Sequence, residues 1–265
     1  FTGGDPQAVG TIENNDTAAL SIADVSQSED GTFTFTVTSS NPSESDITGT
    51  IDTADIASEA AAGTDYTAIS GGTFTITGDS SDTTDTFAVT VNDDNIVEDD
   101  ETFNVNLTNA LFNGSTDASR ATFTGGDPQA VGTIENNDTA VLSIADVSQA
   151  EDGTFQFTVT SSNPTESDVT VTFTTATIAN EATDGSDFSG TTSTATITGD
   201  SSDTTATFTI TVMDDNIVED DETFNVNLTN AQFNGGTDAT RATLTGGDAQ
   251  ALGTIQNNDT AVLSI

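Results

Sequence analysis

Carboxylates are almost the only side chains in this sequence that could perform acid–base or metal chemistry. The 265 residues include 44 Asp and Glu against 2 Lys and Arg, with no His and no Cys, so the formal net charge is −42. Imidazole or thiolate metal ligands, cysteine nucleophiles, Ser–His pairs and disulfides are therefore excluded. A basic surface for nucleic acid or an anionic membrane is excluded as well. What remains is the chemistry of oxygen ligands.

The acidic residues gather in short groups instead of spreading evenly along the chain. Within residues 18–138 the groups are Glu29-Asp30, Asp65, Asp93-Asp94 with Glu98–Glu101, and Glu135 with Asp138. Carboxylates that lie close together with no basic residue beside them repel one another at neutral pH. A hard divalent cation relieves this repulsion. Ca²⁺ suits the task because it accepts roughly six to eight oxygens in flexible geometry, whereas Mg²⁺ requires a stricter octahedron.

Short strands must position these groups. Residues 32–38 alternate polar and apolar side chains without error, which is the period of a half-buried strand. The same alternation surrounds Leu20, Ile47, Phe74, Phe87, Phe103 and Val131. We find no helical stripe of useful length. About seven strands in roughly 120 residues predict an all-β protein of tandem immunoglobulin-like antiparallel β-sandwiches.

The order of the strands predicts where the acidic groups meet. The groups follow the first, third, fifth and seventh predicted strands. Because the chain reverses at each turn of a sandwich, odd-numbered strands finish at the same end. We therefore expect the carboxylates to converge on one pole of each unit.

A long internal repeat sets the domain organisation. Residues 1–18 recur unchanged as 123–140, an offset of 123 − 1 = 122, and recur with changes from Leu244. A period of this length matches a whole domain. We expect 1–16 to be the last strand of a preceding repeat, 18–138 and 140–259 to be complete repeats, and 260–265 to be the first strand of a following repeat. Apolar stretches are far shorter than the ~20 residues of a membrane span, so no membrane-spanning segment is predicted.

Four motifs recur in the same order in both repeats. They are a Glu after the first strand (Glu29, Glu151), Gly-Thr-Asp-Tyr or Gly-Ser-Asp-Phe (63–66, 185–188), Asp-Asp-Asn-Ile-Val-Glu-Asp-Asp-Glu-Thr-Phe (93–103, 214–224) and Gly-Thr-Ile-x-Asn-Asn-Asp (132–138, 253–259). Both repeats thereby resemble the Calx-beta domain, a β-sandwich of sodium–calcium exchangers and of tandem arrays on bacterial surface proteins. In the calcium-binding members of that family, the metal cluster is built from these positions.

The resemblance implies a set of calcium ligands in each repeat. In the first repeat these are Glu29, Asp65, Asp93, Asp94, Glu98, Glu101 and Asp138, with the carbonyl oxygen of Ile96. In the second they are Glu151, Asp187, Asp214, Asp215, Glu219, Glu222 and Asp259, with the carbonyl oxygen of Ile217. Asparagines at 136–137 and 257–258 replace aspartates of the family, and an amide oxygen ligates without adding charge.

These observations lead to a functional hypothesis. Asp138-Thr139 forms almost the entire linker between the repeats, so an ion bound there would stiffen the joint. We expect a non-enzymatic, secreted or cell-surface array that calcium stabilises as a stiff stalk, adhesin or filament. Its partners would be calcium ions, neighbouring repeats of the same chain and, as a further option, identical chains in a fibre.

Other hypotheses remain open. A calcium-sensing regulatory module would use the same sites, although near-identical copies suit length better than sensing. A glycoside hydrolase would use two of the carboxylates, but the chain has no Trp and one Tyr to bind a sugar. The many acidic residues could also serve only to keep the protein hydrated at high salt, with no metal ion bound at a specific site. Arg120 and Arg241, the only basic residues, occupy equivalent positions and are expected to pair with a nearby carboxylate or to contact a neighbouring chain.

Overall fold

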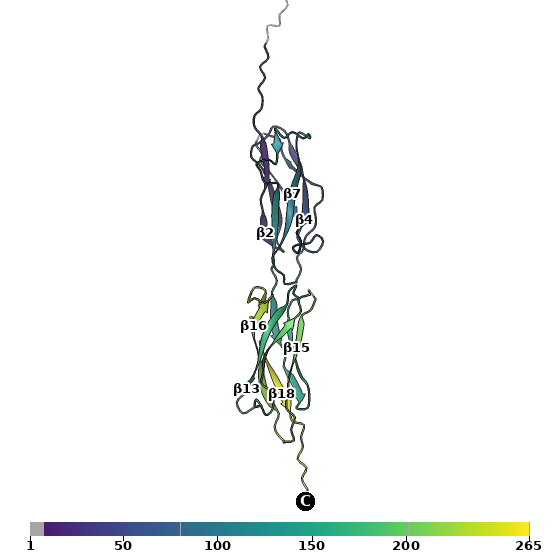
Figure 1. The fold of residues 1–265 in the computed structure, drawn as a ribbon, viewed down its shortest axis with the longest axis vertical. Helices are drawn as coiled ribbons and strands as arrows, with labels where there is room; N and C mark the ends of the chain where they lie inside the picture. The colour runs from purple at the N-terminus through teal and green to yellow at the C-terminus, as the bar shows by residue number, and fades with distance from the viewer. Residues whose placement is uncertain (1–7, 80, 201, 265) are drawn as a thin grey trace, which may run out of the picture. The chain divides into compact units, whose positions relative to one another are not determined.

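The computed structural model describes residues 8–79, 81–200 and 202–264, and none of these residues is helical. The chain forms two compact units (Figure 1). Of the described residues, those up to Asp93 and Asp100–Glu135 form the first unit, and Asp94–Asp99 and those from Asn136 onward form the second. No described segment is a helix of the length and hydrophobicity that crossing a membrane requires.

The first unit is built from two sheets. Its strands are β1 (Ala18–Ile22), β2 (Val25–Ser28), β3 (Phe33–Ser39), β4 (Ile47–Asp55), β5 (Gly72–Ile76), β6 (Thr84–Val89), β7 (Glu101–Phe112), β8 (Ala121–Thr122) and β9 (Gln129–Glu135). One sheet has the strand order β6-β3-β1-β8 and the other β2-β9-β7-β4-β5. All pairs are antiparallel except β1 with β8 and β2 with β9.

The second unit repeats this arrangement. Its strands are β10 (Ala140–Ile144), β11 (Val147–Ala150), β12 (Phe155–Ser161), β13 (Val169–Thr177), β14 (Thr192–Ile197), β15 (Thr205–Ile210), β16 (Glu222–Phe233), β17 (Ala242–Thr243) and β18 (Gln250–Gln256). The strand orders are β15-β12-β10-β17 and β11-β18-β16-β13-β14. The predicted tandem of all-β sandwiches is therefore confirmed.

Each unit has a hydrophobic core of its own, supplied by the apolar side of each alternating strand. In the second unit the ring of Phe224 on β16 stacks on Phe188 at 4.5 Å between ring centroids and lies 6.0 Å from Phe155. Gly253 on β18 makes room for this ring, since a Cβ atom at that position would come within 2.3 Å of it. The Gly-Thr-Ile motif thus includes a glycine that the core requires.

The first predicted strand is in fact two strands, because the chain changes sheets at Ala23-Asp24. The change lets β1 pair with β3 and β2 pair with β9. Asp24 stabilises the switch by accepting a hydrogen bond from the Val131 amide at 2.8 Å, and Asp146 does the same with Leu252 at 2.7 Å. The division of this strand and the short additional strand β8 raise the number of strands per unit above the seven expected. The alternation of side chains could not predict the division, because it does not show where a strand changes its hydrogen-bonding partner.

We predict that Phe224→Ala will lower the free energy of unfolding of the second unit by about 3–5 kcal/mol, because it leaves a cavity among the rings packed around it. Urea denaturation of the full chain measures this change. Val262→Ala is the control, since this side chain is 90% exposed and its truncation should alter stability by less than about 0.5 kcal/mol. Equal effects of the two substitutions would contradict this account of the core.

Candidate metal centre

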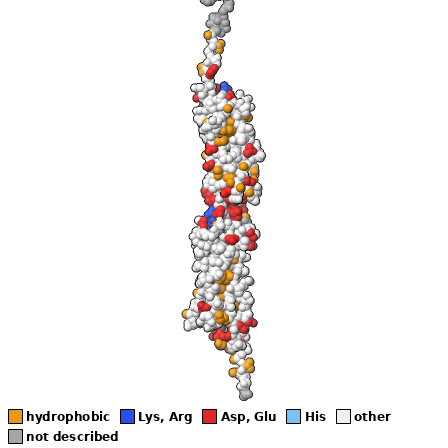
Figure 2. Space-filling view, in the orientation of Figure 1, with side chains coloured by type: hydrophobic (Ala, Val, Ile, Leu, Met, Phe, Trp, Pro, Cys, Tyr) orange, Lys and Arg blue, Asp and Glu red, His pale blue; other side chains and the backbone are white. Residues whose placement is uncertain are grey.

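Four segments of the second unit bring its acidic residues to one pole. Glu151 directly follows β11, and Asp187 lies between β13 and β14. Asp215 and Glu219 lie between β15 and β16, Glu222 is the first residue of β16, and Asp259 follows β18. Figure 2 shows acidic side chains gathered where the chain leaves β18, with few of them over the middle of the visible face of this unit.

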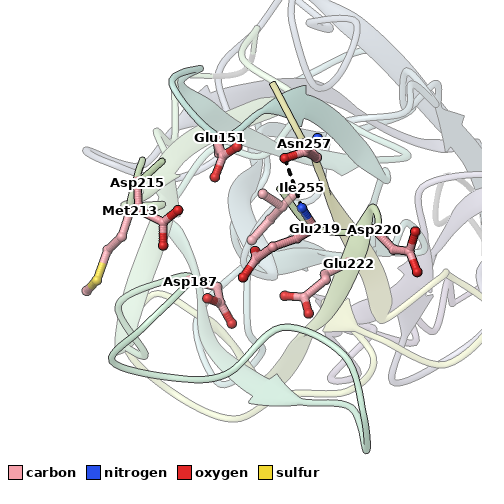
Figure 3. Close-up of a pocket in the computed structure, with 9 residues that line it drawn as sticks. All are labelled: Glu151, Asp187, Met213, Asp215, Glu219, Asp220, Glu222, Ile255 and Asn257. Atoms are coloured by element: carbon pink, nitrogen blue, oxygen red, sulfur yellow. Dashed lines mark hydrogen bonds between the residues drawn. The ribbon is translucent and has the colours of Figure 1, made fainter. Parts of the chain in front are cut away.

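Six of the predicted ligands form two groups of three. Carboxylate oxygens of Glu151, Asp215 and Asp259 lie within 4.8 Å of one another, and those of Asp187, Glu219 and Glu222 do likewise. Five of these six residues, all except Asp259, line a single pocket together with Ile255 and Asn257. In Figure 3 the carboxylates of Asp187, Glu219 and Glu222 point toward a common space, while the side chains of Met213 and Asp220 point away from it.

Backbone hydrogen bonds hold these carboxylates in position. An oxygen of Asp187 accepts the Thr183 amide at 2.6 Å, and an oxygen of Asp215 accepts the Ile217 amide at 2.7 Å. Glu151, which is only 6% exposed, accepts the Asn258 amide at 3.1 Å. Backbone amides therefore orient three of the six carboxylates, two from within the same loop and one from the segment after β18.

The site is electrostatically unbalanced. Burial raises the pKa of Glu219 above its ordinary value, and the negative charges of nearby carboxylates, that of Asp215 first, raise it further. Burial also raises the pKa of Glu222, with the charge of Asp187 adding to the effect. No basic residue lines the pocket. The site therefore lacks positive charge.

Asp259 indicates what would restore the balance. Its Oδ2 atom is buried and, among the residues described, no hydrogen-bond donor reaches it. Burying a carboxylate oxygen without a partner is costly. A hard cation bound to Glu151, Asp215 and Asp259 would satisfy this oxygen and offset the repulsion, so the donor set fits a divalent metal.

The predicted ligands of the first repeat are divided between the two units. Glu29, Asp65, Asp93 and Glu101 belong to the first unit, and Asp94, Ile96, Glu98 and Asp138 belong to the second. Their local contacts follow the pattern of the second repeat: Asp65 accepts the Ala61 amide at 2.6 Å, and Asp94 accepts the Ile96 amide at 2.7 Å. Glu29 is 5% exposed, as Glu151 is 6% exposed.

Besides Asp259, two predicted ligands of the second repeat lie outside the residues that line the pocket. Asp214 accepts a hydrogen bond from the Asn258 side chain at 3.3 Å, and Ile217 is 58% exposed. Their roles as ligands stay predictions. Asn257, which lines the pocket, accepts the Glu219 amide at 3.3 Å and so orders the loop through its amide oxygen (Figure 3).

The sequence reasoning missed a pair of supporting carboxylates, Glu59 and Glu181. Glu181 accepts both the amide and the hydroxyl of Thr223, at 2.9 and 3.1 Å, beside the ligand candidate Glu222. Glu59 makes the same contacts with Thr102. Their separation, 181 − 59 = 122, is the repeat offset and was the signal that could have found them.

The raised pKa values of Glu219 and Glu222 predict how the stability of the metal-free protein depends on pH. A carboxyl group whose pKa is raised by folding stabilises the folded protein below its unfolded pKa, and this stabilisation is lost as the pH rises through the folded pKa. In chelator, the melting temperature should therefore rise as the pH is lowered from neutral toward the ordinary pKa of Glu. Glu222→Gln should weaken this rise, as thermal melting followed by circular dichroism would show.

Asp238 provides the internal contrast for this experiment. Hydrogen bonds, first that of the Thr240 hydroxyl, lower its pKa to about 2. Ionised Asp238 contributes its full stabilisation at any pH above the ordinary pKa range of Asp and loses it only as the pH falls toward 2. Its contribution is therefore constant between about pH 5 and about pH 7. A melting temperature that falls over that interval would contradict the electrostatic account of the pocket.

Comparisons with known proteins place the chain in a family. Solved structures similar to it include "CBD12 from CALX1.2" (16% identity, TM-score 0.40, 90% of this chain and 100% of that chain covered) and the "Apo-form Calx CBD1 domain" (21%, 0.37, 46% and 100%). The chain matches no curated protein sequence. The profile of the Calx-beta domain matches residues 13–129 and 135–257. The chain therefore belongs to the Calx-beta domain family and carries two copies of the domain in tandem.

Proposed function

We propose that each repeat binds calcium and that the bound ions stiffen a structural array of such repeats. The observation that carries this proposal is the pair of three-carboxylate groups in the second unit, one of which includes the buried, partnerless oxygen of Asp259. The role is one of binding, not of catalysis. Calcium would supply the positive charge that the residues of the pocket lack.

The arrangement favours calcium over a general solvating role for the charge. Acidity that served only to keep the protein hydrated at high salt would require exposed carboxylates, whereas Glu151 is 6% exposed and Asp187, Glu222 and Asp259 are half-buried. The mixture of carboxylate and amide oxygens at this pole suits the flexible coordination of Ca²⁺ better than the octahedron of Mg²⁺.

The stiffening role follows from the position of Asp259. Only Thr260 separates it from the sequence Ala-Val-Leu-Ser-Ile, which repeats that of β10 (Ala140–Ile144). An ion held by Asp259 would therefore restrain the backbone at the point where a further repeat begins. Near-identical copies favour a stalk, adhesin or filament outside the cell over a sensor, because length requires many copies and sensing requires few. Millimolar calcium would match weak extracellular sites, whose dissociation constants are about 10⁻⁴–10⁻³ M.

We predict that calcium will raise the melting temperature of the chain by several degrees. Binding to the folded state alone contributes about 2.7 kcal/mol per ion at a hundredfold excess over the dissociation constant. Asp215→Asn combined with Glu222→Gln should remove the effect in the second unit, because the two changes together take one charge from each of the two carboxylate groups. Scanning calorimetry with calcium or with chelator makes the measurement.

Asp203→Asn is the matched control for the calcium experiment. Asp203 is exposed, lies between β14 and β15 and lines no part of the pocket, so this variant should keep the whole calcium effect. An equal melting temperature in calcium and in sodium chloride of the same ionic strength would reject specific binding and favour solvation by charge.

For the stiffening role, we predict that calcium will change the small-angle scattering of the chain toward that of a less flexible particle. Ions at Asp138 would limit the backbone between the repeats, so the flexibility seen in a Kratky plot should fall when calcium is added. Asp138→Asn should reduce the change. A scattering profile that does not respond, in protein shown by calorimetry to bind calcium, would reject stiffening and leave binding intact.

A further inference from the structure

Each repeat carries one predicted ligand on a short loop, and the two loops are held differently. We call residues 61–66 the Asp65 loop and residues 183–188 the Asp187 loop. In both, an oxygen of the aspartate accepts the backbone amide four residues earlier at 2.6 Å. The amide of the aspartate donates to the carbonyl of that same residue, at 3.1 and 3.0 Å. The backbones of the loops therefore match, and the differences lie in the side chains around them.

Asp55, the last residue of β4, holds the Asp65 loop in the first unit. Its Oδ1 atom accepts the Tyr66 hydroxyl at 2.7 Å and the Ala62 amide at 2.9 Å. These donors lie on either side of Asp65 in the chain. Hydrogen bonds to an ionised carboxylate are stronger than those between neutral groups. A single oxygen thus ties both sides of the Asp65 loop to a strand of the sheet.

Two further contacts restrain the same loop. The Asn92 side chain donates to the Thr64 carbonyl at 2.5 Å. Tyr66 is fully buried, and its ring stacks on Phe103 at 4.4 Å between ring centroids. Because this ring is fixed in the core while its hydroxyl is bonded to Asp55, Tyr66 connects the core of the unit to the carboxylate that holds the loop.

The second unit lacks all three of these polar side chains. The positions of Asp55, Tyr66 and Asn92 are occupied there by Thr177, Phe188 and Met213. The side chains of Phe and Met donate no hydrogen bond, and Thr carries no carboxylate. The ring stacking is kept, since Phe188 lies 4.5 Å from its partner ring. The repeats therefore differ in the hydrogen bonds to the loop and not in the packing beneath it.

We propose that Asp55 and Tyr66 are positioning residues for a calcium ion at Asp65, and that the Asp187 loop lacks this support. The inference rests on the calcium binding proposed above. Neither residue would touch the ion, because both act through the backbone of the loop. Groups that hold a metal ligand in place raise the affinity for the metal, and removing one costs about ten- to a hundredfold. Their indirect action places the expected loss near the lower end of that range.

Substitutions at Asp55 separate positioning from a simple effect of charge. Asp55→Asn keeps an acceptor oxygen at the same place and should retain calcium affinity close to that of the original chain. Asp55→Ala removes the acceptor and should weaken binding in the first repeat about tenfold. Asp55 is exposed, so both variants should fold. Equal losses in the two variants would show an effect of charge and overturn the proposal.

Asp52→Ala is the matched control. Asp52 lies on the same strand and accepts the Gly71 amide at 2.8 Å, outside the Asp65 loop. Its removal takes away the same charge and also breaks a hydrogen bond to a backbone amide, but it should leave calcium affinity unchanged. A loss equal to that of Asp55→Ala would mean that the loop contact is not the cause.

Tyr66 supplies a second measurement, because it is the only tyrosine and the chain has no Trp. Its fluorescence therefore reports the first repeat alone, and it should change as calcium binds beside it. Tyr66→Phe removes one hydroxyl and should weaken calcium binding in calorimetry severalfold. This variant should fold, because Phe188 occupies the equivalent position in the second unit.

The second repeat allows the converse experiment. Thr177→Asp with Phe188→Tyr installs the missing contact, and Asp184→Ala removes a carboxylate, now bonded to the Gly190 amide at 2.7 Å, whose charge would oppose the new one. With Tyr66→Phe added, the sole tyrosine reports the second repeat. Calcium should bind there severalfold more tightly than in a reference chain carrying only Tyr66→Phe and Phe188→Tyr.

Calorimetry distinguishes failure of this inference from failure of the proposed function. An original chain that takes up no calcium would reject both. If the original chain binds calcium and the Asp55→Ala and Tyr66→Phe chains bind it equally tightly, positioning is rejected and calcium binding stands. Fluorescence of Tyr66 that does not respond, in a chain shown to bind calcium, would reject positioning in the same way.

Discussion

Repulsion between carboxylates confined at one pole is the constraint on which this protein is organised. The sandwich places the ends of four segments close together, and each of them ends in an acidic residue. Backbone amides of the loops fix several of these side chains in place. The chain thereby assembles negative charge that it does not itself neutralise. A site of this kind is preorganised, because the energy of bringing the charges together is supplied by the folding of the two sheets and not by the ligand.

Packing in the core of the unit helps to hold these carboxylates at the pole. The long strand β16 begins with Glu222 at the pole and carries Phe224 into the core two residues later, so the ligand candidate and the central ring of the core are fixed by the same strand. Gly253 lets β18 approach that ring, and β18 leads in turn to Asn257 and Asp259. Loosening the packing at Phe224 would therefore move carboxylates on two strands at once.

The sequence was informative wherever a local pattern determines structure. Alternation around Phe33 and Phe35 predicts the strands, and the positions of Glu151, Asp187 and Asp259 after strand ends predict their meeting at one pole. The switch of sheets at Asp24 could not be found in this way, because pairing partners leave no mark on a period of two. Val97 and Val218 show a firmer limit: 18 residues around them, 93–110 and 214–231, are identical, so only tertiary surroundings distinguish the buried valine from the exposed one.

The parallel pairing of β11 with β18 has a mechanical consequence. These strands pair along Val147–Ala150 and Gly253–Gln256, and they lie at the beginning and end of the unit. Tension applied to the two ends of the unit would pull the paired strands in opposite directions along their length. The hydrogen bonds of the pair would then bear the load together in shear, and not one after another as in the peeling of a hairpin. A unit so connected resists extension by breaking abruptly and not by yielding gradually.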